Sequence, residues 1–128
     1  MATAALLCTA PAFADEIWSF VTRNETGVKV YVDSASLQRS GDSITFWQKW
    51  DLSETALHAD NSVLAKYRAT IDCAGRRQIL LTAIKYDAAG KVISSFDWSS
   101  EKPDWRPIKD GSVGAQIADA ICTRKSDT

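Results

Sequence analysis

The chain has 128 residues, of which 45% are hydrophobic, so it holds enough apolar material for one ordinary core and predicts one folded domain. Its 15 Lys and Arg residues are scattered and nearly balance 16 Asp and Glu residues, which gives a formal net charge of −1 at pH 7. Nucleic acids and anionic lipids require a one-sided basic surface, so the composition argues against both as partners.

The first residues have the features of an export signal. An apolar stretch over residues 2–10 is followed by Pro11 and by a small-x-small cleavage triplet at residues 12–14. We therefore expect residues 1–14 to be a signal peptide and residues 15–128 to be the exported domain. A buried N-terminal helix is the alternative. No other stretch approaches the ~18 apolar residues of a membrane span, so we expect no transmembrane segment.

Cysteine usage is consistent with export. Cys8 falls within the predicted signal, and Leu7 stands where a lipid-attachment site would have a small residue. Cleavage leaves Cys73 and Cys122 as a pair in a compartment where disulfides persist. A bridge between them would contribute ~4 kcal/mol in the loop-entropy model. Two free buried thiols are the alternative.

Two strands are predicted first. Residues 17–23 and 27–33 alternate between two faces, as half-buried antiparallel strands do. The polar stretch between them ends in Gly27, which predicts a hairpin turn. Asp33 ends the second strand before two serines, and this is the chemistry of a capped turn rather than of an acid and a nucleophile. Residues 34–42 predict a short helical turn followed by a tight turn.

Two further strands carry the candidate surface residues. Residues 43–53 alternate with Trp47 on one face and Trp50 on the other, so we expect one of the two indoles to face solvent. Residues 64–73 alternate between an apolar face and a face with basic side chains, so one face of this strand is wet.

The third part of the chain predicts a hairpin and an irregular segment. Residues 76–87 are apolar on both faces, which suits a central strand. Residues 90–98 form a second strand after a turn that closes with Gly90. Residues 99–112 contain two prolines, so we expect an extended, irregular segment.

The period then changes, and residues 112–122 predict an amphipathic helix. Its apolar residues recur every four positions, with small residues on the adjoining stripe, so the helix can lie close to a sheet. We expect Asp110 or Ser112 to cap it. The apolar positions are Val113, Ile117 and Ile121.

These elements predict an α+β domain, a six-stranded antiparallel meander sheet with one C-terminal helix packed on one face. A bond between Cys73 and Cys122 would hold the helix against the sheet. The opposite face has no second layer to cover it and is left open to water or to a partner.

A set of residues and short motifs follows in fixed order along the chain: Trp18, "VYVD", "ITFWQKW", Cys73 with "RRQILLTAIKYDAAGKVISS", Trp105-x-Pro107-Ile108, Gly111-Ser112 and Cys122. This ordered set resembles that of the bacterial surface-adhesin protein E family over essentially the whole exported chain. The resemblance implies the six-stranded sheet, the helix and a disulfide between Cys73 and Cys122. It implies surface exposure and binding of host extracellular-matrix or plasma proteins, and it raises the question of a homodimer. The name-giving members are lipoproteins, whereas this chain has no convincing lipid-acceptor cysteine.

Little in the sequence supports catalysis. His58 is the sole histidine and lies in the polar stretch "ETALHADN", without a nucleophile motif or a glycine-rich elbow. His58 with Asp60 provides two ligands, fewer than a zinc site requires. No phosphate loop or dinucleotide fingerprint is present. We therefore expect a non-enzymatic protein without a metal or cofactor.

The functional candidates lie on the uncovered sheet face instead. Aromatic and Arg side chains gathered on a strand surface suit protein recognition, so we expect a protein partner. The family resemblance implies a host matrix protein as this partner, and an envelope protein is the alternative. The alternative is that the indoles are core and the basic residues are ordinary solvated positions. A periplasmic accessory or structural protein is the second functional interpretation, so the address is either the periplasm or the outer cell surface. The candidates are Trp47, Lys49, Trp50, Lys66 and Arg68.

Overall fold

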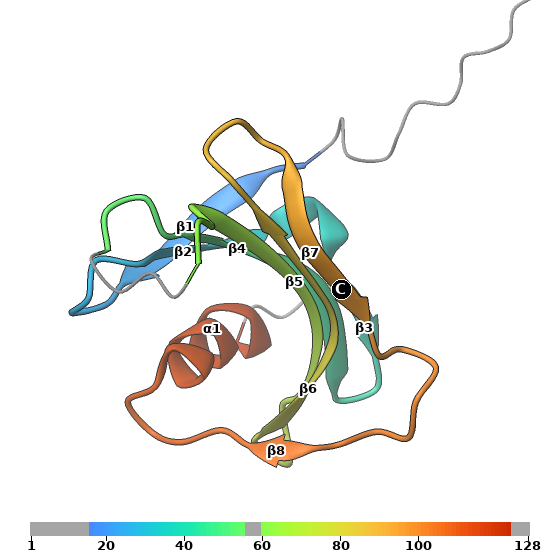
Figure 1. The fold of residues 1–128 in the computed structure, drawn as a ribbon. Coiled ribbons are helices and arrows are strands. Elements are labelled where there is room, and N and C mark those ends of the chain that lie inside the picture. Colours follow the sequence, from blue (N-terminus) through green and yellow to red (C-terminus); the bar gives the residue numbers. More distant parts are fainter. Residues whose placement is uncertain (1–15, 56–59, 124–128) are drawn as a thin grey trace, which may run out of the picture.

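The structure, a computed structural model, describes residues 16–55 and 60–123 and consists there of one antiparallel sheet curved around one α-helix (Figure 1). The helix is α1 (Val113–Cys122), and a short 3-10 helix, η3 (Ser34–Ser36), follows the second strand. The strands are β1 (Trp18–Arg23), β2 (Lys29–Asp33), β3 (Gln38–Ser40), β4 (Ser43–Asp51), β5 (Leu64–Asp72), β6 (Arg77–Tyr86), β7 (Val92–Asp97) and β8 (Arg106–Pro107).

The main path of the sheet is the predicted antiparallel meander, in the order β1-β2-β4-β5-β6-β7. The strand count was wrong, since the sheet has eight strands rather than six. The two additional strands are β3, which pairs with β4, and β8, which pairs with β6. They have three and two residues, too few to show an alternating pattern in the sequence.

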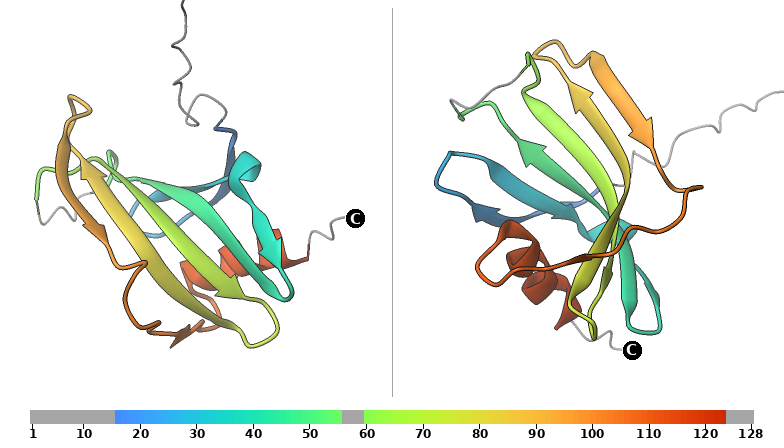
Figure 2. Two further views of the ribbon diagram at one scale, coloured as in Figure 1. Left: turned by 90° about the vertical axis from the view of Figure 1, so that its right-hand side faces the viewer. Right: turned by 60° about the horizontal axis from the view of Figure 1, so that its bottom comes forward.

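The core lies between the sheet and the helix. In β4 the side chains of Ile44 and Phe46 are buried while those of Thr45 and Trp47 are partly exposed, which is the period of a strand with one covered face. α1 lies in the hollow of the curved sheet (Figures 1 and 2). The buried core residues are Val28, Val30, Val32, Ile44, Phe46, Ala69, Ile71, Ile108, Ala115, Ile117, Ala118 and Ile121.

The helix begins where the sequence predicts, and Ser112 rather than Asp110 is its N-cap. The Ser112 hydroxyl accepts a hydrogen bond from the backbone N–H of Ala115 at 3.1 Å. A Cβ atom at Gly114 would come within 3.0 Å of the Gln78 amide nitrogen, so this glycine permits a close approach to β6. At the other end of the helix, the Arg39 guanidinium in β3 donates to the carbonyl of Ile121 at 2.9 Å.

The expected disulfide between Cys73 and Cys122 is present, with an S–S distance of 2.10 Å. Cys73 directly follows β5, and Cys122 is the last residue of α1. The bond therefore fixes the end of the helix to the sheet, on the side where the core lies. Among residues 16–55 and 60–123, no helix has both the length and the apolar character of a membrane span.

Candidate protein-binding surface

The two sides of the sheet differ in what covers them. We call the side that packs against α1 the helix side, and the opposite side the uncovered side. No second layer of described residues lies over the uncovered side (Figure 2). In β5 the buried residues Ala65, Ala69 and Ile71 face the helix side, so the intervening Lys66 and Arg68 face the uncovered side.

Strand register brings two of the candidate residues, Lys49 and Lys66, into one row with Tyr31 on the uncovered side. Tyr31 in β2 pairs with Lys49 in β4, and Lys49 pairs with Lys66 in β5. The row extends to Phe20 in β1, which pairs with Tyr31. Like charges directly opposite on neighbouring strands destabilise a sheet, so the pairing of Lys49 with Lys66 requires compensation.

Aromatic rings surround both ammonium groups and provide part of that compensation. The Lys49 Nζ lies 4.8 Å from the centre of the Trp18 ring and 4.9 Å from that of Tyr31. The Lys66 Nζ lies 5.6 Å from the centre of the Trp18 ring and 5.7 Å from that of Tyr86. All four distances fall within the range of cation–π attraction. Trp18 thus contacts both lysines.

Glu16 supplies a carboxylate to this group, and we call Glu16, Trp18, Tyr31, Lys49, Lys66 and Tyr86 the cation–aromatic cluster. One Glu16 oxygen lies 3.4 Å from the Lys66 Nζ, and the other accepts a hydrogen bond from the Trp18 indole N–H at 3.1 Å. The structure describes no ion pair for Lys49. Burial, and next the charge of Lys66, lower the pKa of Lys49 below its ordinary value.

Trp47 and Arg68 continue the uncovered side next to the cluster. They pair directly between β4 and β5, and Arg68 pairs with Thr82 in β6. Thr82 pairs in turn with Asp97 in β7. Hydrogen bonds from Ser99 lower the pKa of the Asp97 carboxyl, and the charge of Arg68 adds to this effect.

Four of the five candidate residues therefore share one side of the sheet, and Trp50 does not. Trp50 lies on the helix side, because it is an odd number of residues from Trp47 along β4. Its indole N–H donates to the Gln48 side-chain oxygen at 2.6 Å, and its ring meets that of Tyr67 edge-on with centroids 5.6 Å apart. Trp50 packs against the core and is no part of the uncovered surface.

Sequence reasoning missed the aromatic members of the cluster, although their alternation was visible. Trp18 stands on one face of a predicted strand, and Tyr31 stands opposite the valines of the next. The missing information was the register between strands, which decides that Trp18 comes to lie over Lys49 and Lys66. Tyr86 lies near the end of the strand that was expected to be apolar on both faces, and no pattern marked it.

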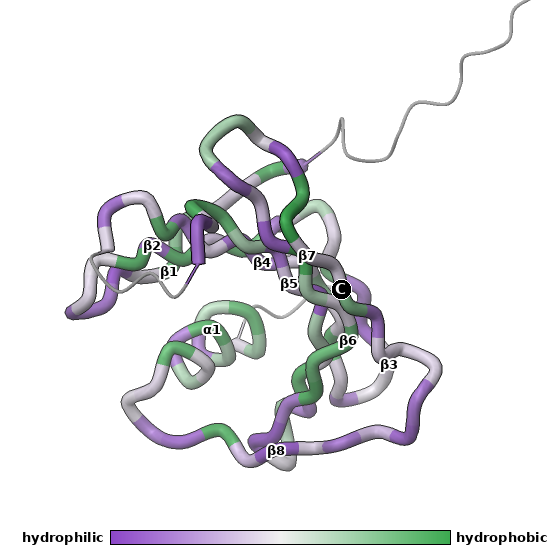
Figure 3. The backbone as a smooth tube through the Cα atoms, viewed as in Figure 1, coloured by the Kyte–Doolittle hydropathy of each residue, from purple (hydrophilic) through white to green (hydrophobic). Residues whose placement is uncertain are grey.

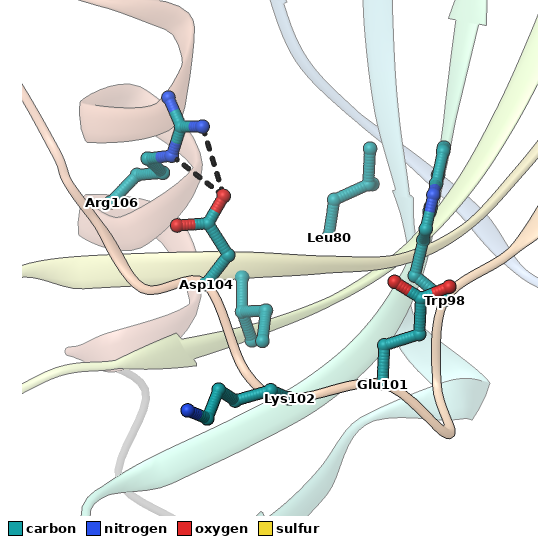
Figure 4. Close-up of a pocket in the computed structure, with 7 residues that line it drawn as sticks. Leu80, Trp98, Glu101, Lys102, Asp104 and Arg106 are labelled. Atoms are coloured by element: carbon teal, nitrogen blue, oxygen red, sulfur yellow. Dashed lines mark hydrogen bonds and ion pairs between the residues drawn. The ribbon is translucent and has the colours of Figure 1, made fainter.

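A cavity of about 480 Å³ lies outside this surface, between β6 and the segment that leads to β8. Figure 3 shows this segment as mostly hydrophilic. Figure 4 shows Leu80 between Trp98 and a paired Asp104 and Arg106. The Arg106 Nε and Nη2 atoms donate to one Asp104 oxygen at 3.1 and 2.9 Å, so these charges satisfy each other. The lining residues are Ile79, Leu80, Trp98, Glu101, Lys102, Asp104 and Arg106.

The part of the chain that the structure describes contains no group of three or more His, Cys, Asp and Glu side chains arranged for a metal ion. His58, the one candidate base in the sequence, lies outside the described residues. Asp33, which precedes the serines, accepts hydrogen bonds at 2.9 Å from the N–H of Ile17 and at 3.0 Å from that of Ala35. The predicted capping role of Asp33 is therefore confirmed.

The sequence and the fold both resemble those of known proteins. A family model described as surface-adhesin protein E matches residues 18–123. A structure of Haemophilus influenzae protein E has a TM-score of 0.57 at 15% identity and covers 83% of each chain. A second crystal form has a TM-score of 0.57 at 14% identity and covers 81% of this chain and 87% of that chain.

A structure of protein E from non-typeable Haemophilus influenzae has a TM-score of 0.54 at 13% identity and covers 95% of this chain and 83% of that chain. At these identities the likeness shows the shared fold. A comparison with curated proteins gave no match.

Proposed function

The chain belongs to the surface-adhesin protein E family, and from this we propose that it is an exported, non-enzymatic binding protein that contacts a protein partner through the uncovered side of its sheet. The observation that carries the proposal is the gathering of aromatic and basic side chains on that side. Interfaces are enriched in Tyr, Trp, Phe and Arg, and the residues that dominate binding energy are drawn from this group.

The exposure of Phe20 supports this use of the surface. Its side chain is 59% exposed and meets the Tyr31 ring edge-on, with centroids 5.6 Å apart. A large aromatic ring beside charged groups offers an apolar area that a partner can cover, while the rim remains polar. Arg68 and Trp47 extend the same surface toward β7 and η3.

We propose a host extracellular-matrix or plasma protein as the partner, and the outer cell surface as the location. The surface-adhesin description of the family supports this choice. Export through residues 1–14 as a signal peptide remains a prediction, because those residues lie outside the described part of the chain. A homodimer also remains open, and the solution mass of the purified chain tests it.

A periplasmic accessory or structural protein is the second candidate. It is favoured by one observation in the sequence, that Leu7 precedes Cys8 where a lipid-attachment site would have a small residue. Protease treatment of intact cells separates the two, because cleavage of the chain supports the adhesin and full protection overturns surface display.

Binding to immobilised, purified matrix and plasma proteins tests the surface itself. The full chain is compared with Trp47→Ala, Arg68→Glu and a control, Lys91→Ala, which lies in an exposed turn. We expect a partner whose binding is weakened at least about tenfold by each uncovered-side substitution and is unaffected by the control. A partner that binds all four proteins equally would refute use of the uncovered side.

A further inference from the structure

We propose that the partner places a carboxylate side chain against Lys49, at the centre of the cation–aromatic cluster, with an apolar side chain beside it over Phe20. The inference deepens the proposed function and rests on it. The occupant is thus an acidic segment of a protein, in which Asp or Glu stands next to a large apolar residue.

The first argument is charge. The cluster holds two ammonium groups and one carboxylate, and that carboxylate contacts Lys66 at 3.4 Å. Lys49 is partly buried and forms no ion pair among the described residues. The charges of Glu16 and Asp51 favour its ammonium form, but burial and the charge of Lys66 outweigh them, so its pKa is lowered. Aromatic rings attract an ammonium group but do not neutralise it, so a cation–π setting leaves its N–H donors available. A second carboxylate would balance the cluster.

The second argument is that Glu16 already shows how a carboxylate binds in this setting. It uses one oxygen for the Trp18 indole N–H and the other for the ammonium group of Lys66. Lys49 approaches the same Trp18 ring, at 4.8 Å from the ring centre, and has the Tyr31 ring at 4.9 Å. The single Trp18 N–H is already donated to Glu16, so a partner's carboxylate would reproduce only the ammonium half of this setting, at Lys49. Charge-assisted hydrogen bonds of this kind are stronger than neutral ones.

The third argument selects a protein rather than a sulfated glycan. Phe20 lies in the same row as Lys49, next to Tyr31, and is 59% exposed. A polyanionic sugar would satisfy the lysine but leave this ring in water. A protein segment satisfies both, because an apolar side chain next to its carboxylate removes the exposed ring from solvent.

The probe for the test is poly(Glu,Tyr), a soluble copolymer that combines carboxylates with aromatic rings. Its binding to the full chain is measured by calorimetry, and the NMR signal of the Trp18 indole N–H reports the location. We expect Lys49→Met to weaken binding about tenfold, Lys49→Arg to retain it, and Lys91→Ala to change it less than about twofold. Because Lys49→Arg keeps the charge, it separates loss of a cation from local unfolding.

Three results would overturn the inference: equal binding by Lys49→Met and Lys91→Ala, an unperturbed Trp18 signal, or heparin binding that is tighter and equally dependent on Lys49. The last result would indicate a glycan partner. If binding of a partner is weakened by Trp47→Ala and Arg68→Glu but not by Lys49→Met, only this inference is refuted. If none of these substitutions weakens its binding, the proposed function is refuted as well.

Discussion

Cys73 and Cys122 are bonded across a separation of 49 residues, with their Cα atoms 5.8 Å apart. The bond joins the end of β5 to the last residue of α1, and α1 covers the only buried face of the sheet within the described residues. The uncovered side is therefore defined by the position of the helix. If the helix left its place, both sides of the sheet would be open.

Replacing both cysteines with serine tests this bond. We expect the double variant to lose about 4 kcal/mol of unfolding free energy in the loop-entropy model, because the unfolded chain regains the freedom of a long loop. Urea denaturation of the oxidised protein and the variant measures the loss. Reduced wild-type protein serves as the control and is expected to match the variant. A loss below about 1 kcal/mol would show that packing alone holds α1 in place.

The N-cap of α1 gives a second prediction. Ser112→Ala removes the hydroxyl that accepts from the Ala115 N–H at 3.1 Å, so we expect a loss of about 1 kcal/mol. Ser112→Asp restores an acceptor at the N-terminus of the helix, and its stability is expected to remain close to that of the wild type. Equal losses in the two variants would contradict a capping role.

Gly27 and Gly90 form a matched pair of turn glycines. Both have positive φ, +94° for Gly27 and +84° for Gly90, but a Cβ at Gly27 would lie 2.9 Å from the backbone oxygen of Glu54 whereas one at Gly90 meets nothing within 4 Å. We expect Gly90→Ala to cost about 1 kcal/mol from backbone strain. Gly27→Ala is expected to cost at least about 1 kcal/mol more, because the Glu54 loop must shift. Thermal unfolding of both variants measures the difference, and equal costs would refute the close approach.

The sequence was informative where a segment was long enough to show a period. The alternation in β4 and β5 and the four-residue spacing in α1 predicted the sheet, the helix and the side on which Lys66 and Arg68 lie. β3 and β8 were missed because three and two residues are too few to show a period. The choice between Trp47 and Trp50 required knowledge of which face packs on the helix.

Asp72, the last residue of β5, predicts a pH dependence of stability. The Asp72 carboxylate accepts the Gly75 N–H at 2.9 Å and the Arg77 Nε–H at 2.8 Å, and these bonds hold its pKa below the ordinary value of 3.8. A lowered pKa in the folded state stabilises the fold above the unfolded pKa, and the benefit is lost as the pH falls through the folded pKa.

Asp72→Asn removes this titration. We expect the variant to have a lower urea midpoint than the wild type at pH 7, and the gap to narrow as the pH falls toward 2. Glu25→Gln, in an exposed turn, is the matched control and is expected to show no such convergence. A gap that stays constant over this range would mean that the Asp72 charge does not contribute to folding.

Substitution of Lys49 tests whether this residue serves the stability of the fold or the binding of a partner. Burial and the neighbouring Lys66 lower its pKa below the ordinary value of 10.5, so its charge opposes folding at pH 7, and this cost is relieved as the pH rises through the folded pKa. Cation–π contacts with Trp18 and Tyr31 offset this by about 0.5–1 kcal/mol. Lys49→Met keeps a flexible stem between the two rings and removes the charge.

We therefore expect the unfolding free energy of Lys49→Met to lie within about 1 kcal/mol of that of the wild type at pH 7. As the pH rises toward 10.5, we expect the wild type to become more stable relative to the variant. Urea midpoints across this range measure both effects, with Lys91→Ala as the control. If Lys49→Met lowers the unfolding free energy by more than about 2 kcal/mol at pH 7, the main role of Lys49 is to stabilise the fold. Near-equal stability together with weakened binding of poly(Glu,Tyr) would leave recognition as the reason for placing two lysines opposite each other on the sheet.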